Sequence, residues 1–100
     1  MDRQDSATNG VRRLEPSQDV VAQRLGDEVV LVSLQTNRIF ELNRTGARFW
    51  ELMQSESDRG RIEQQLLEEF EISKAELSAE VDQLIKSLAD EELVRILDDD

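Results

Sequence analysis

Apolar residues are arranged differently in the two halves of this chain, and in the first half they gather in short segments typical of β-strands. Val20 to Leu25 and Glu28 to Leu34 are rich in β-branched and aliphatic residues, and they flank Gly26-Asp27, a two-residue sequence typical of a tight hairpin turn. These segments predict a β-hairpin.

A third strand is predicted after a second turn, over Arg38 to Leu42. Alternation places Phe40 and Leu42 on one face of this strand and Ile39 and Glu41 on the other. Because the strand is short and comes last, we expect it at an edge of the sheet.

The second half of the chain follows the helical period. Asn43 is suited to cap a first helix that ends near Gln54, because its side chain accepts a hydrogen bond from an unpaired amide of the first turn. Gly46 is expected to permit close packing at the start of this helix. Its apolar stripe consists of Phe49, Trp50 and Met53. We expect these side chains in the core rather than against a ligand.

Two further helices are predicted. Arg61 to Phe70 has apolar residues four positions apart, and Ser73-Lys74-Ala75-Glu76 has the spacing of a capping box that begins a third helix, running to about Asp90. The apolar residues of the third helix fall on one continuous face: Leu77, Val81, Leu84, Ile85 and Leu88. Leu93 to Ile96 adds a short extended segment.

Three strands followed by three helices predict an α+β domain with the helices gathered against the sheet. The last two helices would form a helix-turn-helix and the strands a wing, so the predicted fold is winged helix-turn-helix-like. A chain of 100 residues is long enough for one core. We assign residues 19–97 to this domain, residues 1–18 to a flexible N-terminal tail and residues 98–100 to an acidic C-terminal end.

The composition argues against catalysis. The chain contains no cysteine and no histidine, so the usual ligands of zinc and iron–sulfur clusters are missing, and we expect neither a metal nor a cofactor. Its serines have no histidine to activate them, and paired carboxylates such as Glu68 and Glu69 do not face each other on a helix. With no apolar run near the ~20 residues of a membrane span and no signal peptide, we expect a cytoplasmic protein that binds no membrane.

The net charge of −11 is concentrated in the helical half, where residues 46–100 carry six basic and sixteen acidic groups. Such a surface repels phosphate, so we expect no nucleic acid as a partner, whereas a basic peptide or protein would be attracted. The alternative is that the acidic face binds no partner and serves only to keep the protein soluble. A winged-helix DNA-binding regulator, dimeric through Leu93 to Leu97, is the rival function, although its third helix is acidic where a recognition helix needs basic groups.

The edge of the third predicted strand is the strongest candidate site. Arg38 to Leu42 would expose unpaired backbone donors and acceptors, and an extended peptide pairs with such an edge by strand addition. The third helix would supply one wall of the pockets for its side chains. The alternative is an edge merely blunted by Arg38 and Glu41.

This arrangement resembles the PqqD-like family, the small precursor-peptide recognition domains of ribosomally made, modified peptides. The resemblance covers about Val20 to Ile96. It rests on three motifs that are moderately specific in combination: Leu42-Asn43-x-Thr45-Gly46-Ala47-x-x-Trp50, then Leu67-Glu68-Glu69-Phe70-Glu71-Ile72, then Val81-Asp82 and Leu84 to Leu88 before Leu93-Val94. The chain departs from the pattern at Glu91-Glu92, where many members have a glycine.

The resemblance implies a peptide-binding function. Family members bind the leader segment of a precursor peptide as an added strand on the third strand and pack its apolar side chains against the third helix. Carried over by position, the peptide-binding residues are Arg38, Ile39, Phe40, Glu41 and Leu42 in the strand, and Glu80, Val81, Leu84, Ile85 and Leu88 in the helix, some of which must serve the core instead. Glu41 and Glu80 would pair with basic residues of the leader.

The implied partners are the precursor's leader peptide and a modifying enzyme such as a radical SAM enzyme, a peptidase or a cyclase. The chain would act as a free-standing adaptor between the two. The product of the pathway, whether a quinone cofactor, a lasso peptide or another compound, stays open, as does the oligomeric state.

Overall fold

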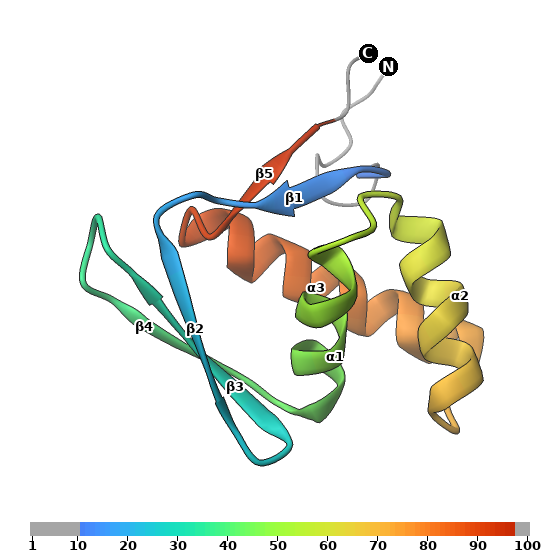
Figure 1. The fold of residues 1–100 in the computed structure, drawn as a ribbon. Helices are drawn as coiled ribbons and strands as arrows, with labels where there is room; N and C mark the ends of the chain where they lie inside the picture. Colours follow the sequence, from blue (N-terminus) through green and yellow to red (C-terminus); the bar gives the residue numbers. More distant parts are fainter. Residues whose placement is uncertain (1–10, 98–100) are drawn as a thin grey trace.

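The computed structural model describes residues 11–97, which form a three-stranded sheet with all three helices on one of its sides (Figure 1). The elements in chain order are β1 (Leu14–Pro16), β2 (Val20–Leu25), β3 (Glu28–Ser33), β4 (Ile39–Leu42), α1 (Arg44–Met53), α2 (Arg59–Glu69), α3 (Lys74–Asp90) and β5 (Val94–Ile96). The predicted α+β fold is confirmed: a three-stranded antiparallel sheet is followed by three helices.

The sheet has the order β2-β3-β4, so that β4 lies at one edge, as predicted. The predicted turn joins β2 to β3, with Gly26 in the left-handed conformation at φ 66°. Asn37, at φ 61°, occupies the same region in the turn between β3 and β4. The turn predicted at Gly26-Asp27 and the second turn predicted before the third strand are therefore both present.

The helix starts follow from their caps. The Asn43 side chain accepts a hydrogen bond from the Gly46 amide at 2.9 Å, and Ser73 and Glu76 form the predicted capping box at the start of α3. Asp58 caps α2 in the same way, which places its start two residues before the predicted Arg61. The close packing predicted at Gly46 is also present, since a Cβ built there would lie 3.3 Å from Leu42 Cδ2.

The helix α3 ends just before Glu91-Glu92, where many PqqD-like proteins have a glycine. Glu92 adopts the left-handed conformation at φ 58°, the conformation that glycine takes most readily after a helix. The Leu93 amide then donates to the Leu88 carbonyl at 2.8 Å, which closes the helix end. Glu92 therefore ends α3 with the left-handed backbone conformation that a glycine would adopt there, and this conformation strains the backbone of a residue other than glycine.

One core joins the sheet to the helices, and the predicted core residues Phe49, Trp50 and Met53 lie in it, at most 6% exposed. Arg59 is the one buried charged residue among residues 11–97. It pairs with Glu63 within α2 at 2.6 Å, and it joins α2 to α3 through Asp82 at 2.5 Å. Burial works to lower the pKa of Arg59, but the hydrogen bonds and charges of the two carboxylates outweigh it and raise the pKa. This ion cluster fixes the orientation of α3 relative to α2.

The prediction of a flexible tail over residues 1–18 is wrong for residues 11–18. Val11 and Leu14 are buried in the core, and β1 pairs antiparallel with β5. The backbone there is held on two sides, because the Leu14 amide donates to the Ser57 carbonyl and the Leu97 amide donates to the Arg13 carbonyl. Residues 1–10 of the predicted tail, and the acidic end at 98–100, lie outside the described residues.

A bidentate ion pair between Arg48 and Glu69, with nitrogen to oxygen distances of 2.7 and 2.8 Å, ties α1 to α2. The hydrogen bonds from Arg48, with a further one from Gln65, lower the pKa of Glu69 to about 2 from its usual 4.5. A carboxylate with a lowered pKa stabilises the fold above its unfolded pKa and loses that effect as the pH falls toward the folded value.

We therefore predict a stability loss specific to Glu69 between about pH 4.5 and about pH 2, with the direction set by the lowered pKa. The melting temperature of the Glu69→Gln variant should fall less over this interval than that of the wild-type chain, because glutamine has no proton to gain. Thermal melts by circular dichroism across the interval measure the difference. Parallel curves for the two proteins would contradict the assigned role.

Candidate functional site

A groove of about 240 Å³ lies between β4 and α3. Its floor is apolar and is made by side chains from the sheet, from α1 and from α3: Phe40, Leu42, Phe49, Val81 and Leu84. Polar and acidic residues border it: Glu41, Asn43, Thr45, Glu80, Gln83 and Ser87. An apolar floor with a polar border suits an amphipathic peptide better than a small charged metabolite.

The geometry of α3 explains why the groove is apolar. Its residues Leu77, Val81, Ile85 and Leu88 are at most 1% exposed and face the core. Leu84 lies beside this stripe and is only partly buried, on the part of the helix surface that faces β4 rather than the core. One helix therefore serves both the core and the groove with a single wide apolar face.

The free edge of β4 runs along the groove. Among residues 11–97, β3 is the only strand paired with β4. The Ser33 amide donates to the Arg38 carbonyl at 3.0 Å, and in an antiparallel ladder the bonded pairs then alternate, so Phe40 and Leu42 bond to β3. The amides and carbonyls of Ile39 and Glu41 consequently point to the open edge, where an added strand would find two donors and two acceptors.

The side chains of β4 alternate as the sequence predicts. Leu42 is buried and Phe40 is partly buried, both on the groove side, whereas Ile39 is 67% exposed and Glu41 is exposed. Ile39 is thus placed to contribute to the groove edge through its backbone rather than its side chain.

An ion pair outside the residues that line the groove joins the start of β4 to the end of α3. Arg38, just before β4, contacts Glu91 at the end of α3 through two nitrogens, at 3.0 and 3.1 Å from the carboxylate oxygens. One end of the groove lies beside Asn43, Thr45 and Glu80, where a shallower depression continues toward Phe70 and Ile72. A bound chain can leave the groove at this end without displacing an ion pair.

The structure brings together six of the ten residues predicted to bind a peptide: Phe40, Glu41, Leu42, Glu80, Val81 and Leu84 all line the groove. Ile39 contributes its backbone to the open edge of β4, and Arg38 is outside the residues that line the groove. The prediction is wrong for Ile85 and Leu88, which are fully buried and present no surface to a ligand.

Sequence reasoning missed several residues of the groove, chiefly Phe49, Gln83 and Ser87. The two on α3 carry a usable signal, since positions 80, 83, 84 and 87 share one face of a helix. Phe49 carried none, because its helical spacing fits the core equally well, and it is in fact fully buried beneath the groove.

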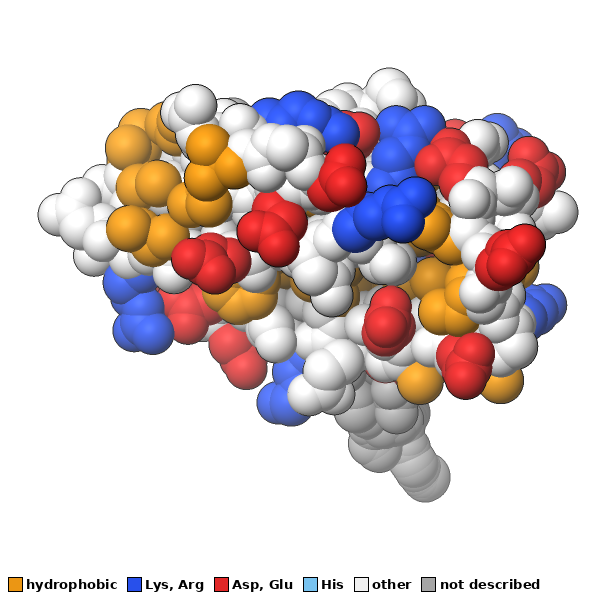
Figure 2. Space-filling view, turned by 90° about the horizontal axis from the view of Figure 1, so that it is seen from below, with side chains coloured by type: hydrophobic (Ala, Val, Ile, Leu, Met, Phe, Trp, Pro, Cys, Tyr) orange, Lys and Arg blue, Asp and Glu red, His pale blue; other side chains and the backbone are white. Residues whose placement is uncertain are grey.

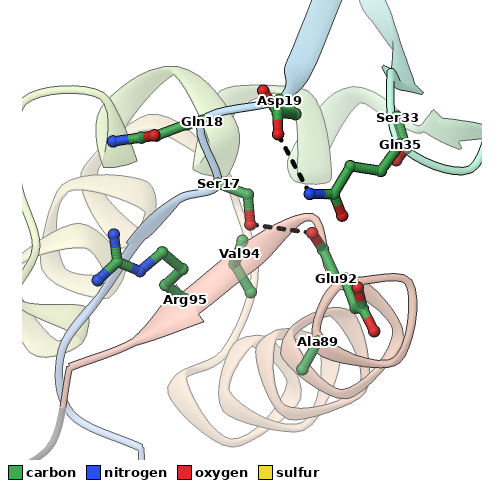
Figure 3. Close-up of a pocket in the computed structure, with 9 residues that line it drawn as sticks. All are labelled: Ser17, Gln18, Asp19, Ser33, Gln35, Ala89, Glu92, Val94 and Arg95. Atoms are coloured by element: carbon green, nitrogen blue, oxygen red, sulfur yellow. Dashed lines mark hydrogen bonds between the residues drawn. The ribbon is translucent and has the colours of Figure 1, made fainter.

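A second cavity, of about 380 Å³, lies where the β1–β2 connection meets the ends of β3 and α3 (Figure 3). Two hydrogen bonds join the segments that line it. The Ser17 hydroxyl donates to the Glu92 carbonyl at 2.9 Å, and the Gln35 amide donates to Asp19 at 3.2 Å. These bonds hold the junction of four segments, so the cavity is better explained as a structural joint than as a site.

Over residues 11–97, no group of three or more acidic side chains is arranged to hold a metal ion. Within the same range, no helix has the length and apolar content that a membrane span requires.

Comparisons with known proteins agree with this geometry. A family model described as coenzyme PQQ synthesis protein D (PqqD) matches residues 28–94. The fold is also similar to a solved structure of TbiB1 in complex with the TbiA(beta) leader peptide, with a TM-score of 0.77 and 28% sequence identity, covering 85% of this chain and 99% of that one. No curated protein matches the chain by sequence.

Proposed function

The chain belongs to the PqqD family, and from this premise we propose that it is a non-enzymatic adaptor for the maturation of a ribosomally made peptide. It captures the leader segment of the precursor by strand addition to β4. It then presents the attached core peptide to a modifying enzyme such as a radical SAM enzyme, a peptidase or a cyclase. The product is a quinone cofactor, a lasso peptide or a related compound.

The observation that carries this proposal is the apolar groove beside the unpaired edge of β4. TbiB1, which has a similar fold, forms a complex with a leader peptide. In strand addition, main-chain hydrogen bonds supply affinity and pockets for alternate side chains supply specificity. Here Ile39 and Glu41 offer the main-chain groups, and Phe40 and Leu84 line the pocket.

The charges around the groove define the ligand further. Glu80 lines the groove and is exposed, with no ion pair among residues 11–97, whereas the Glu41 side chain alternates to the other side of β4, beside Ile39. A peptide with an apolar residue for the groove and a lysine or arginine close to it would bind with complementary charge. The acidic surface also disfavours the rival function of duplex binding, because phosphate contacts need basic groups.

Peptides selected from a display library of short random sequences provide the ligand for the test. We expect the selected peptides to combine an apolar residue with a basic neighbour, and to shift the amide resonances of Ile39–Leu42 and of the Glu80–Ser87 face of α3 in NMR titrations. A duplex DNA fragment, assayed by mobility shift at two salt concentrations, serves as the negative control. Shifts confined to other regions, or strong salt-sensitive duplex binding, would overturn the proposal.

Strand addition makes a sharper prediction at Glu41, whose amide points to the open edge. Proline at this position removes the outward donor and leaves the bonds to β3 in place, because edge strands accept proline where the amide faces solvent. The Glu41→Ala variant loses the charge and keeps the amide. We expect Glu41→Pro to bind a selected peptide about 3- to 10-fold more weakly than Glu41→Ala, which corresponds to one hydrogen bond of about 0.5–1.5 kcal/mol. Equal affinities of the two variants in calorimetric titrations would argue against strand addition at this edge.

A further inference from the structure

The face of the three-stranded sheet that points away from the helices is largely apolar, and its polar residues are Gln23, Glu28 and Glu41. Cross-strand pairing places Val21, Val32 and Ile39 in one row across all three strands, and Val30 and Leu25 lie on the same face. Val21 is 48% exposed, Leu25 55% and Ile39 67%. We call these five residues the outer face.

Apolar residues on this side of the sheet need an explanation. A sheet with one face on the core usually alternates apolar residues inside with polar residues outside. Here the inner side holds Val29, Leu31 and Leu42 in the core, yet the opposite side is also largely apolar. Figure 2 shows apolar side chains gathered over the end of the molecule that the sheet forms, with acidic side chains beside them. An exposed, contiguous apolar surface with a polar border is typical of a protein–protein contact.

Nothing in the described part of the chain covers the outer face, since all three helices lie on the other side (Figure 1). Residues 1–10 contain only Met1 and Ala7 as apolar side chains, so their sequence offers little to bury against it.

The charges select the kind of partner. The charged side chains on the same side of the sheet, Glu28 and Glu41, are both acidic. A second copy of this chain would bring these carboxylates together, and each copy carries a net charge of −11. A partner with an apolar patch bordered by lysine or arginine fits both the apolar and the acidic parts of this surface.

The outer face is continuous with the proposed peptide edge. Ile39 belongs to the row of the outer face and also to the open edge of β4. A strand added to β4 would extend the sheet, and every second side chain of that strand would join the outer face. A protein docked there would contact the sheet and the bound peptide together.

We propose that the outer face is the docking surface for the enzyme that modifies the bound precursor, and that this enzyme presents an apolar patch with a basic border. This inference rests on the proposed function, because it identifies the partner by its action on the captured peptide. Docking on the outer face brings the enzyme next to the strand from which the core peptide emerges.

The test uses lysine substitutions at exposed positions outside β4. Val21→Lys and Leu25→Lys remove apolar contact area and place a positive charge against the basic border. Ala22→Lys is the matched control, because Ala22 is exposed on the same strand with its side chain on the other side of the sheet. The probe is the purified modifying enzyme of the pathway, titrated into each variant by biolayer interferometry, with peptide affinity measured in parallel.

We expect both outer-face variants to bind the enzyme at least 10-fold more weakly than Ala22→Lys, with peptide affinity unchanged in all three. Wild-type affinity for the enzyme in both outer-face variants would overturn the inference. It would also be overturned if light scattering showed a wild-type dimer that Val21→Lys dissociates, because the face would then hold a second copy. A wild-type chain that binds no peptide would instead contradict the proposed function, so the two failures can be told apart.

Discussion

Replacing Leu84 with arginine is expected to weaken leader capture by about 30-fold or more. Leu84 forms part of the groove floor opposite Phe40, and it is the partly buried apolar residue that α3 offers to a ligand. Arginine there would fill the groove and place a charge where an apolar side chain should bind. Central apolar contacts of this kind contribute about 2 kcal/mol or more to binding, and each 1.4 kcal/mol corresponds to a factor of ten.

The matched control is Ala75→Arg, which adds the same side chain to an exposed position of α3. Position 84 comes nine positions after position 75, so their side chains lie on opposite sides of the helix. Both variants should keep the wild-type circular dichroism spectrum, and only Leu84→Arg should lose affinity in calorimetric titrations with a selected peptide. Unchanged affinity of Leu84→Arg would remove the groove from the mechanism of capture.

The elements that could be predicted from the sequence are those specified by local signals. Gly26 at the hairpin, Asn43 before α1 and the capping box at Ser73 each fix the backbone within a few residues, and each has the predicted conformation. The third strand followed from the alternation between Phe40 and Leu42. These features need no knowledge of the distant parts of the chain.

The strand β1 could not be predicted because its partner is far away in sequence. It has three residues, and its pairing with β5 joins Leu14 to Ile96. Two isolated apolar residues, Val11 and Leu14, give no periodicity to recognise. These two residues are buried through contacts with distant parts of the chain, and local periodicity in the sequence does not reveal such contacts.

The sequence also could not show which apolar residues of α3 face the core and which line the groove. A helical period identifies one apolar face but does not say which neighbour covers each part of it. Ile85 and Leu88 look like Leu84 in the sequence, yet they are fully buried and Leu84 borders the groove. The position of α3 against its neighbours decides this, and long-range contacts such as that between Arg59 of α2 and Asp82 of α3 contribute to that position.

Replacing Leu14 with alanine is expected to lower the free energy of unfolding by about 2–5 kcal/mol, a large part of the 5–15 kcal/mol typical of a small domain. Leu14 is fully buried, and its truncation leaves a cavity between the sheet of β1 and β5 and the helices. For a domain of this size the melting temperature should fall by about 8 °C or more. Urea and thermal unfolding followed by circular dichroism measure both quantities.

Gln18→Ala is the matched control for this substitution, because Gln18 is exposed and lies only four residues further along the same segment. Its stability should stay within about 0.5 kcal/mol of the wild-type value, as is usual for surface substitutions. A Leu14→Ala variant as stable as Gln18→Ala would mean that residues 11–18 contribute little to the core, as a flexible tail would. A large loss at Leu14 alone would instead establish that the domain extends to the segment before β2 and depends on the side chain that this segment buries in the core.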